Sequence, residues 1–294
     1  MALATQRTHS SGLHAPAQQA WSVFWQEPGQ TRCVAGAPQI WHALAAHWTR
    51  FAAKLSARAR VLDVGCGAGA VGRLLLEARN DVHVTGVDFA RLPLTLRPGI
   101  ELLPETAMED LPFHDASFGA AVSQFAIEYS DVAASAREIA RVLAPGAGVS
   151  MLVHHAGSDI VTANQRRLDA LHSLLDDSVR SAFCGGEAGA FQALMAALRA
   201  RHGQDELIAQ ITSALPSRLA RPAPERAAIW KAVVEALAPE RCLAESLRAS
   251  CVAEAELAAW LEPLREVFRL GAPVVLRESG GQPIAWTVEG IRLG

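Results

Sequence analysis

The chain has 294 residues, 50% of them hydrophobic, which suits one large domain or one and a half ordinary ones. Its 27 lysines and arginines nearly balance its 30 aspartates and glutamates. The resulting net charge of −3 argues against a nucleic-acid partner and against an anionic membrane surface. No window approaches the roughly 18 unbroken apolar residues of a membrane span, so none is expected.

The beginning of the chain and its cysteines carry little functional signal. Residues 1–20 are polar and Ala-rich, lack the apolar core of a signal peptide, and are expected to form a loose tail. The five cysteines are odd in number and none has metal-ligand spacing. This usage favours a reduced cytoplasmic protein without a metal site.

An aromatic-rich segment follows the tail. Four of the seven tryptophans fall early in the chain: Trp21, Trp25, Trp41 and Trp48. Apolar residues at three- and four-residue steps predict a helix over 38–56 that packs on a sheet. We interpret 21–57 as an N-terminal helical cap. Its first aromatic residues are either part of the core or a flap over a ligand.

Strands alternate with helices over residues 58–158, which predicts a parallel sheet with helices on both faces. Asp131 is expected to cap the second helix, and Pro145-Gly146 to end it. The expected elements are strands near 60–65, 82–87, 100–104, 118–125 and 149–153, and helices over 69–79 and 131–143.

The pattern then becomes purely helical. Residues 159–270 repeat apolar positions at helical spacing. Two strand-like runs at 273–277 and 284–288 flank a glycine turn, which is typical of a hairpin. The chain therefore predicts a helical insertion before a closing hairpin at 271–294. The insertion is either a lid over an acceptor pocket or an addition to the core or to a dimer face, which leaves a homodimer open.

The strongest local signal is the segment Val61-Leu62-Asp63-Val64-Gly65-Cys66-Gly67-Ala68-Gly69. Its three glycines allow a ligand to approach the backbone closely. Asp88, about twenty residues beyond the turn, is placed to accept hydrogen bonds from two ribose hydroxyls. Phe89 beside it can lie against an adenine ring. A strand, this turn, a helix and a second strand ending in an acid indicate an adenosine-type ligand.

Two cofactors fit this arrangement to different degrees. Residues 67–72 satisfy the G-x-G-x-x-G spacing of dinucleotide enzymes. The turn begins earlier, however, at Gly65, and the Asp63 carboxylate inside the first strand is disfavoured near a pyrophosphate. A carboxylate there suits a ligand with a cationic amino group and no phosphate. S-adenosylmethionine is such a ligand.

At these residues the sequence resembles the class I S-adenosylmethionine-dependent methyltransferases, specifically the small-molecule group that includes the ubiquinone and menaquinone methylases. Further matching segments are Thr85-Gly86-Val87-Asp88, Met108-Glu109-Asp110-Leu111-Pro112-Phe113 and 137–146. The resemblance covers 58–155 and the closing hairpin. It implies an α/β fold with a doubly wound, mostly parallel seven-stranded sheet, the Rossmann-like methyltransferase fold, here with an inserted all-helical subdomain.

The resemblance also implies which residues hold the cofactor. Asp63, Gly65 and Gly67 would surround its methionine part, with Cys66 as the small residue between the glycines. Asp88 would hold the ribose. The other implied contacts are Phe89 on the adenine face, the Met108 backbone amide on the adenine ring with Glu109 beside it, and Gln124 and Phe125 on the sulfonium side.

One position departs from the family pattern. Family members usually carry an Asp shortly before the Leu-Pro-Phe triplet, which accepts a hydrogen bond from the adenine amino group. Here Thr106 and Ala107 stand at the candidate positions. The contact is therefore left to Thr106 or to Glu109.

Side chains after the fourth and fifth strands are the candidates to meet a methyl acceptor: Glu128, Tyr129, His154 and His155. A histidine suits the role of general base near neutral pH. Such a base is needed only for a poorly ionised hydroxyl, carbon or amine acceptor. Adjacent residues on a strand point apart, so the two histidines do not form a metal site.

The sequence therefore predicts in-line methyl transfer from S-adenosylmethionine to a small, aromatic or hydrophobic acceptor. An NAD-dependent oxidoreductase and a non-catalytic S-adenosylmethionine-binding partner subunit remain as alternatives. Nucleic-acid methylation is disfavoured, because Ser123-Gln124-Phe125-Ala126 lacks the Asn-Pro-Pro-Tyr-like turn that accompanies a flipped base.

Overall fold

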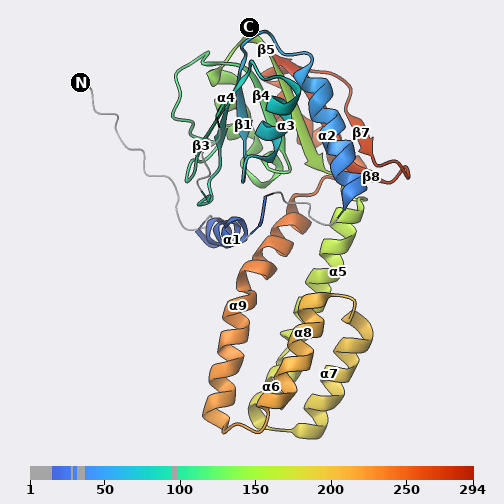
Figure 1. Ribbon diagram of the computed structural model, residues 1–294. Coiled ribbons are helices and arrows are strands. Elements are labelled where there is room, and N and C mark those ends of the chain that lie inside the picture. The colour runs from blue at the N-terminus through green and yellow to red at the C-terminus, as the bar shows by residue number, and fades with distance from the viewer. Residues whose placement is uncertain (1–14, 28, 32–36, 94–97) are drawn as a thin grey trace, which may run out of the picture. The chain divides into compact units, whose positions relative to one another are not determined.

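The computed structural model describes residues 15–27, 29–31, 37–93 and 98–294 (Figure 1). By their contacts they fall into two compact units. One unit contains the chain up to Val161 together with Ala249–Gly294, and the other is Thr162–Arg248. The first helix, α1 (Ala15–Gln26), begins inside the segment expected to be a loose tail, whose residues 1–14 lie outside the described residues.

The first unit is built on one twisted sheet. Its strands within the described residues are β1 (Arg60–Val64), β2 (His83–Val87), β3 (Ile100–Leu103), β4 (Phe118–Gln124), β5 (Leu143–His154), β6 (Phe268–Leu270), β7 (Val274–Arg277) and β8 (Pro283–Arg292). Their order is β3-β2-β1-β4-β5-β8-β6, and β7 also pairs with β8. Strands β1 to β5 run parallel, and β8 runs antiparallel to β5.

The sheet is seven strands wide, because β6 and β7 pair with successive stretches of β8 on the side away from β5. The strand order reverses between β1 and β4, and in folds of this kind ligands bind at the carboxyl ends of the strands at such a reversal. The expected doubly wound, mostly parallel fold is confirmed.

Helices cover both faces of the sheet (Figure 1). Helices α2 (Pro38–Ala52) and α3 (Ala70–Ala78) pack on one face, and α4 (Val132–Val142) and α10 (Glu254–Arg265) on the other. Side chains alternate along a strand. Leu62 and Val64 of β1 therefore join the layer of α4 and α10, whereas Val61 joins that of α2 and α3. By the same alternation, Asp63 faces α2 and α3.

Helix α4 begins as expected, but it does not end at Pro145-Gly146. The Asp131 side chain caps it by accepting a hydrogen bond from the amide of Ala134 at 3.0 Å. The helix ends at Val142, however, and β5 starts at the next residue. Pro145 and Gly146 therefore lie inside β5, which is longer than the strand expected at 149–153.

The second unit is helical and has its own core. Its elements include most of α5 (Asp159–Leu174), then α6 (Asp177–Gly185), α7 (Ala188–His202), α8 (Glu206–Ala214) and most of α9 (Ala223–Ser250). The unit ends at Arg248, before the expected limit of 270, because Leu257, Leu261 and Leu264 of α10 belong to the core of the sheet. None of the described helices is long and apolar enough to cross a membrane.

We expect Phe183→Ala to lower the free energy of unfolding of the helical unit by about 3 to 5 kcal/mol. Phe183 is fully buried, with its ring centroid 5.2 Å from that of Phe191 and 6.1 Å from that of Trp230. Chemical denaturation followed by circular dichroism measures the effect. Arg180→Ala is the matched control, since its ion pair with Asp177 is exposed and contributes little. Equal effects of the two substitutions would contradict the account.

Candidate active site

A cradle of three glycines joins β1 to α3. Gly65, Gly67 and Gly69 have φ values of 70°, 49° and 75°, a left-handed region that favours glycine. The amides of Gly65 and Cys66 donate to the carbonyl of Val87 at 2.8 and 3.0 Å, which ties the turn to the end of β2. A Cβ on Gly65 would lie 2.1 Å from that of Ala126, so no larger residue fits there.

Asp63 carries a buried carboxylate below this cradle. The residue is 1% exposed, and neither carboxylate oxygen has a hydrogen-bond partner. Burial raises the pKa of Asp63 to about 7, and Asp88 adds to the shift. The Arg73 guanidinium and the amide of Gly72 act to lower this pKa. The Gly72 amide does so without forming a hydrogen bond to the carboxylate. A buried polar group without a partner is costly. The arrangement therefore fits a ligand that brings a cation or hydrogen-bond donors.

Asp88 closes the other side of the turn. One carboxylate oxygen accepts from the Gly67 amide at 2.8 Å and the other from the Ala90 amide at 2.9 Å. Burial raises the pKa of this carboxyl to about 6. A carboxylate oxygen can accept more than one hydrogen bond, so Asp88 retains acceptor capacity for the hydroxyls of a ligand. It fits the ribose-holding position implied by the sequence.

Cys66 has a packing role in the turn. Its Sγ and Cβ both lie 2.7 Å from the position that a Cβ on Gly86 would take, so the two residues fit only because Gly86 has no side chain. Burial raises the pKa of the Cys66 thiol well above its usual value. The thiol therefore stays protonated and unreactive.

The residues expected around adenine are partly brought to the cradle. The amide of Thr106 donates to the carbonyl of Asp88 at 2.9 Å, which places the loop after β3 beside the acid. Met108 reaches the turn, with its Cε 3.6 Å from the position of a Cβ on Gly65. Phe89 is half-buried. One carboxylate oxygen of Glu109 accepts from the amide of Asp131 at 3.1 Å.

Gln124 and Phe125, at the end of β4, have different partners. The indole Nε1 of Trp48 on α2 donates to Gln124 Oε1 at 2.7 Å, and both groups are buried. Gln124 thus binds α2, on the face of the sheet that α2 and α3 cover. Phe125 has a φ of 57° and stacks on the His154 ring, with the centroids 4.1 Å apart. The left-handed backbone at Phe125 breaks the alternation of the strand.

Three of the four candidate catalytic residues come together. Glu128 lies in the short 3-10 helix Ile127–Tyr129 after β4, and His154 ends the neighbouring β5. Glu128 Oε1 accepts from the backbone amide of His154 at 2.9 Å and lies 2.7 Å from its Nδ1. The ring of Tyr129 meets that of His154 edge-on, with centroids 5.9 Å apart. A carboxylate on Nδ1 fixes its proton and leaves the Nε2 lone pair available as a base.

The fourth candidate points elsewhere. The His155 ring packs on Trp286 of β8 with centroids 4.6 Å apart, and its Nδ1 accepts from the amide of Gly157 at 3.0 Å. Burial and the charge of Arg277 lower its pKa. Strand alternation separates the two histidines, as expected. Across the described residues, no three His, Cys, Asp or Glu side chains form a group that could hold a metal ion.

Helix α1 lies on the glycine cradle. Trp25 is 5% exposed, and a Cβ on Gly67 would fall 2.2 Å from its Cζ2. Trp21 stacks on Trp25 at 6.3 Å and meets the Tyr129 ring edge-on at 5.7 Å. Both roles that the sequence left open for these aromatic residues stay predictions at this point.

Two polar side chains of α1, which sequence reasoning missed, fasten it to the loop after β2. Gln18 Nε2 donates to the carbonyl of Phe89 at 2.7 Å, and Ser22 Oγ accepts from the amide of Arg91 at 2.9 Å. No motif marks either residue. The one available signal is that Ser22 shares a helix face with Gln18 and Trp25, at helical spacing.

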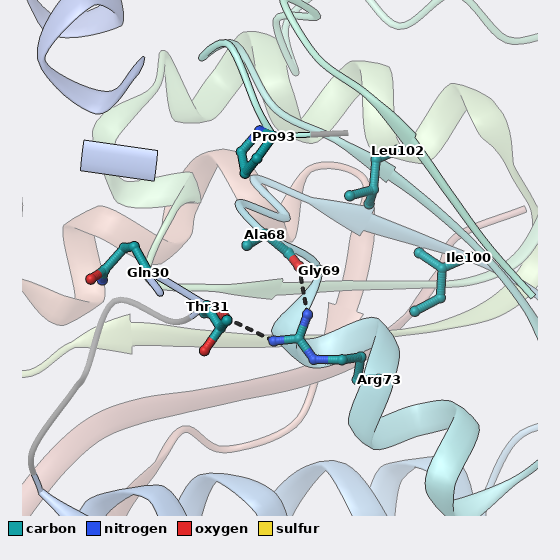
Figure 2. A pocket seen from close by; sticks show the side chains of 8 residues that line it. All are labelled: Gln30, Thr31, Ala68, Gly69, Arg73, Pro93, Ile100 and Leu102. Carbon is teal, nitrogen blue, oxygen red and sulfur yellow. Dashed lines mark hydrogen bonds between the residues drawn. The ribbon is translucent and has the colours of Figure 1, made fainter. Parts of the chain in front are cut away.

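Figure 2 shows a pocket of about 170 Å³ beside the cradle, lined by Gln30, Thr31, Ala68, Gly69, Arg73, Pro93, Ile100 and Leu102. The Arg73 guanidinium donates to the carbonyls of Ala68 and Thr31 at 2.6 and 2.8 Å, which holds the segment after α1 against the turn. The volume falls short of the roughly 300 Å³ at which ligand pockets begin. Neither Asp63 nor Asp88 lines it.

Comparison with known proteins agrees with this geometry. Residues 62–151 match the family model described as a methyltransferase domain. That segment runs from the middle of β1 into β5 and contains the glycine cradle, Asp88 and Glu128. No curated relative matches the chain.

Several solved structures are similar. The Burkholderia thailandensis 1,6-didemethyltoxoflavin-N1-methyltransferase, solved with 1,6-didemethyltoxoflavin and S-adenosylhomocysteine, is 11% identical with a TM-score of 0.51, covering 99% of this chain and 94% of that one. The N-methyltransferase NodS from Bradyrhizobium japonicum, with S-adenosylhomocysteine, is 10% identical with a TM-score of 0.49, covering 94% and 98%. A Haloferax volcanii putative methyltransferase in complex with the activator Trm112 is 15% identical with a TM-score of 0.48, covering 88% and 92%.

At these identities the Burkholderia enzyme supports the fold, and the family model supports the activity. The family match, the sheet order and the cradle with its two acids agree with one another. They support a methyltransferase domain over residues 62–151, with S-adenosylmethionine as its cofactor.

Proposed function

We propose that the protein transfers a methyl group, by in-line displacement, from S-adenosylmethionine to a small aromatic or hydrophobic acceptor, as in the small-molecule group that the sequence resembles. The observation that carries the proposal is the Asp63 carboxylate. It is buried beside three left-handed glycines, and both its oxygens lack partners. An ammonium cation on the ligand would supply the missing donors and charge.

Each cofactor-binding residue has a distinct part in this proposal. Asp63 binds the ammonium group of the methionine part, and Gly65 and Gly67 let that part lie on the backbone. Asp88 accepts from the ribose hydroxyls, while its bonds to the amides of Gly67 and Ala90 hold it in place. Phe89 and the loop at Met108 flank the adenine. The bound cofactor supplies a methyl group on a sulfonium, which is already strongly electrophilic, so positioning provides much of the rate.

The acceptor is activated by His154 in this proposal. Its Nε2 takes the proton of the acceptor, and Glu128 is the positioning residue that holds Nδ1. Phe125 on one face of the imidazole and Tyr129 at its edge restrict the ring. These rings favour an apolar, planar acceptor. His155 has no part, since it packs on Trp286.

The two alternatives have less support. A dinucleotide would bring its pyrophosphate to a turn that already contains a buried carboxylate without a partner, Asp63, and like charges repel. A non-catalytic subunit would have no use for a buried carboxylate on a histidine between aromatic rings. The Glu128 side chain is fully buried, and its Oε1 contacts both the backbone amide and Nδ1 of His154.

A labelled-methyl screen tests the proposal. The full chain is incubated with S-adenosylmethionine carrying a labelled methyl group and with panels of phenols, quinol precursors, heteroaromatic N–H compounds and amines. The panel includes 1,6-didemethyltoxoflavin, which the similar Burkholderia enzyme binds. Label is expected in an aromatic hydroxyl or N–H acceptor. Transfer only to nucleic acid or to protein would contradict the proposed acceptor class.

A further inference from the structure

Helix α1 bridges the two halves of the proposed site. Its Trp25 lies on Gly67 of the cofactor cradle. Its Trp21 lies against Tyr129, and the Tyr129 ring meets that of His154. Trp25 forms a small apolar cluster with Cys66, Ala90 and Leu92, residues of the cradle and of the loop after β2. The helix is therefore seated on the residues that hold the ligand.

The position of Trp25 conflicts with that of a ligand on the cradle. A glycine without a Cβ leaves space that lets a ligand approach the backbone. At Gly67 that space contains the indole ring, since a Cβ there would lie 2.2, 2.5 and 2.7 Å from three of its carbon atoms. The amide of Gly67 is bonded to Asp88, the acid proposed to hold the ribose. An indole ring and an adenosine ligand cannot both occupy this surface.

We infer that α1 is a displaceable plug, in which Trp25 competes with the cofactor for the surface of Gly67. The inference rests on the proposed function. Burial of a tryptophan that is only 5% exposed stabilises the plugged state, and the bonds of Gln18 and Ser22 add to it. The apparent affinity for the cofactor is then reduced by the fraction of molecules that are plugged.

The plug also sets an order of binding. Trp21 and Trp25 lie one helical turn apart on the same short helix, so a displacement that frees Gly67 also withdraws Trp21 from Tyr129. Entry of the cofactor thereby uncovers the aromatic edge beside Glu128 and His154. The acceptor is expected to bind after the cofactor.

The test compares S-adenosylhomocysteine binding to the full chain and to two variants by titration calorimetry. Trp25→Ala is expected to lower the Kd about tenfold or more, because the plugged state loses its main apolar contact. Val23→Ala is the matched control. Val23 is on the exposed side of the same helix, so its Kd is expected to stay within about twofold of the unmodified chain.

Hydrogen exchange of the unmodified chain gives a second readout that needs no variant. Saturating S-adenosylhomocysteine is expected to speed exchange at amides 15–26, since the plug leaves its seat. An unchanged or higher Kd in Trp25→Ala, or slower exchange on binding, would overturn the plug and make α1 a lid that closes over the ligand. Binding to Trp25→Ala alone supports the plug. Binding to neither chain would refute the proposed function itself.

Discussion

Replacing Asp63 by asparagine is expected to weaken S-adenosylhomocysteine binding about 100-fold near pH 8, because a charge-assisted contact is lost. The same substitution is expected to raise the free energy of unfolding of the ligand-free protein by about 2 kcal/mol at that pH, because it removes a buried charge. Asp63 is 1% exposed and its oxygens have no partners. One change therefore separates binding from stability. Calorimetric titration and urea denaturation measure the two effects.

The stability effect has a definite pH dependence. The pKa of Asp63 is raised from 3.8 to about 7, so the native state holds a proton that the unfolded chain has lost between these values. Stability contributed by this group therefore falls as pH rises from about 4 to about 7. The gain of Asp63→Asn over the unmodified chain is expected to be absent near pH 4 and complete above pH 7.

The control for Asp63→Asn is Glu101→Gln, which changes an exposed carboxylate on β3. It is expected to leave S-adenosylhomocysteine binding, and the pH dependence of the free energy of unfolding, as in the unmodified chain. Asp88, whose pKa is also raised, is common to all three chains and largely cancels in the comparison. A stability gain of Asp63→Asn that is the same at every pH would contradict an ionised carboxylate as its cause.

His154→Asn is expected to lower kcat for the acceptor found in the labelled-methyl screen by about 10² to 10⁴. It should leave S-adenosylhomocysteine binding within about threefold, because no cofactor-binding role is proposed for this ring. The imidazole is the only titratable ring that Glu128 holds among the described residues. His155→Asn is the matched control and is expected to keep kcat, since His155 packs on Trp286. Equal losses of kcat in both variants would contradict the role of His154 as the general base.

Glu128→Gln separates positioning from mere packing. The substitution conserves size but removes the carboxylate that holds Nδ1 of His154. We expect kcat to fall about tenfold while the Kd for S-adenosylhomocysteine and the yield of folded protein stay unchanged. A purely structural role would lower the yield of folded protein and weaken cofactor binding together with kcat.

Local pattern predicted most of the sheet and the cofactor cradle. Hydrophobic runs, the glycine turn and the acids at 63 and 88 each depend on a few neighbouring residues, and parallel strands bring their carboxyl ends to one edge. The pairing of Glu128 with His154 was partly accessible for the same reason, since both lie at the carboxyl ends of adjacent strands.

Long-range contacts were not accessible from the sequence. Trp48, 76 residues away, donates to the carbonyl oxygen of Gln124, a contact that the sequence did not predict. The start of α1 inside a polar, Ala-rich segment goes with a contact to the loop after β2, where Gln18 Nε2 donates to the carbonyl of Phe89, 71 residues away. Helix α10 looked like part of the insertion because its spacing is helical, whereas its leucines pack in the core of the sheet. The helical spacing of apolar residues alone does not reveal which core a helix joins.

The most direct test of the central claim is a calorimetric titration of the full chain and of Trp25→Ala with S-adenosylhomocysteine and, separately, with NADH. The account predicts saturable binding of S-adenosylhomocysteine at one site per chain and no binding of NADH. Binding of NADH without binding of S-adenosylhomocysteine would contradict it.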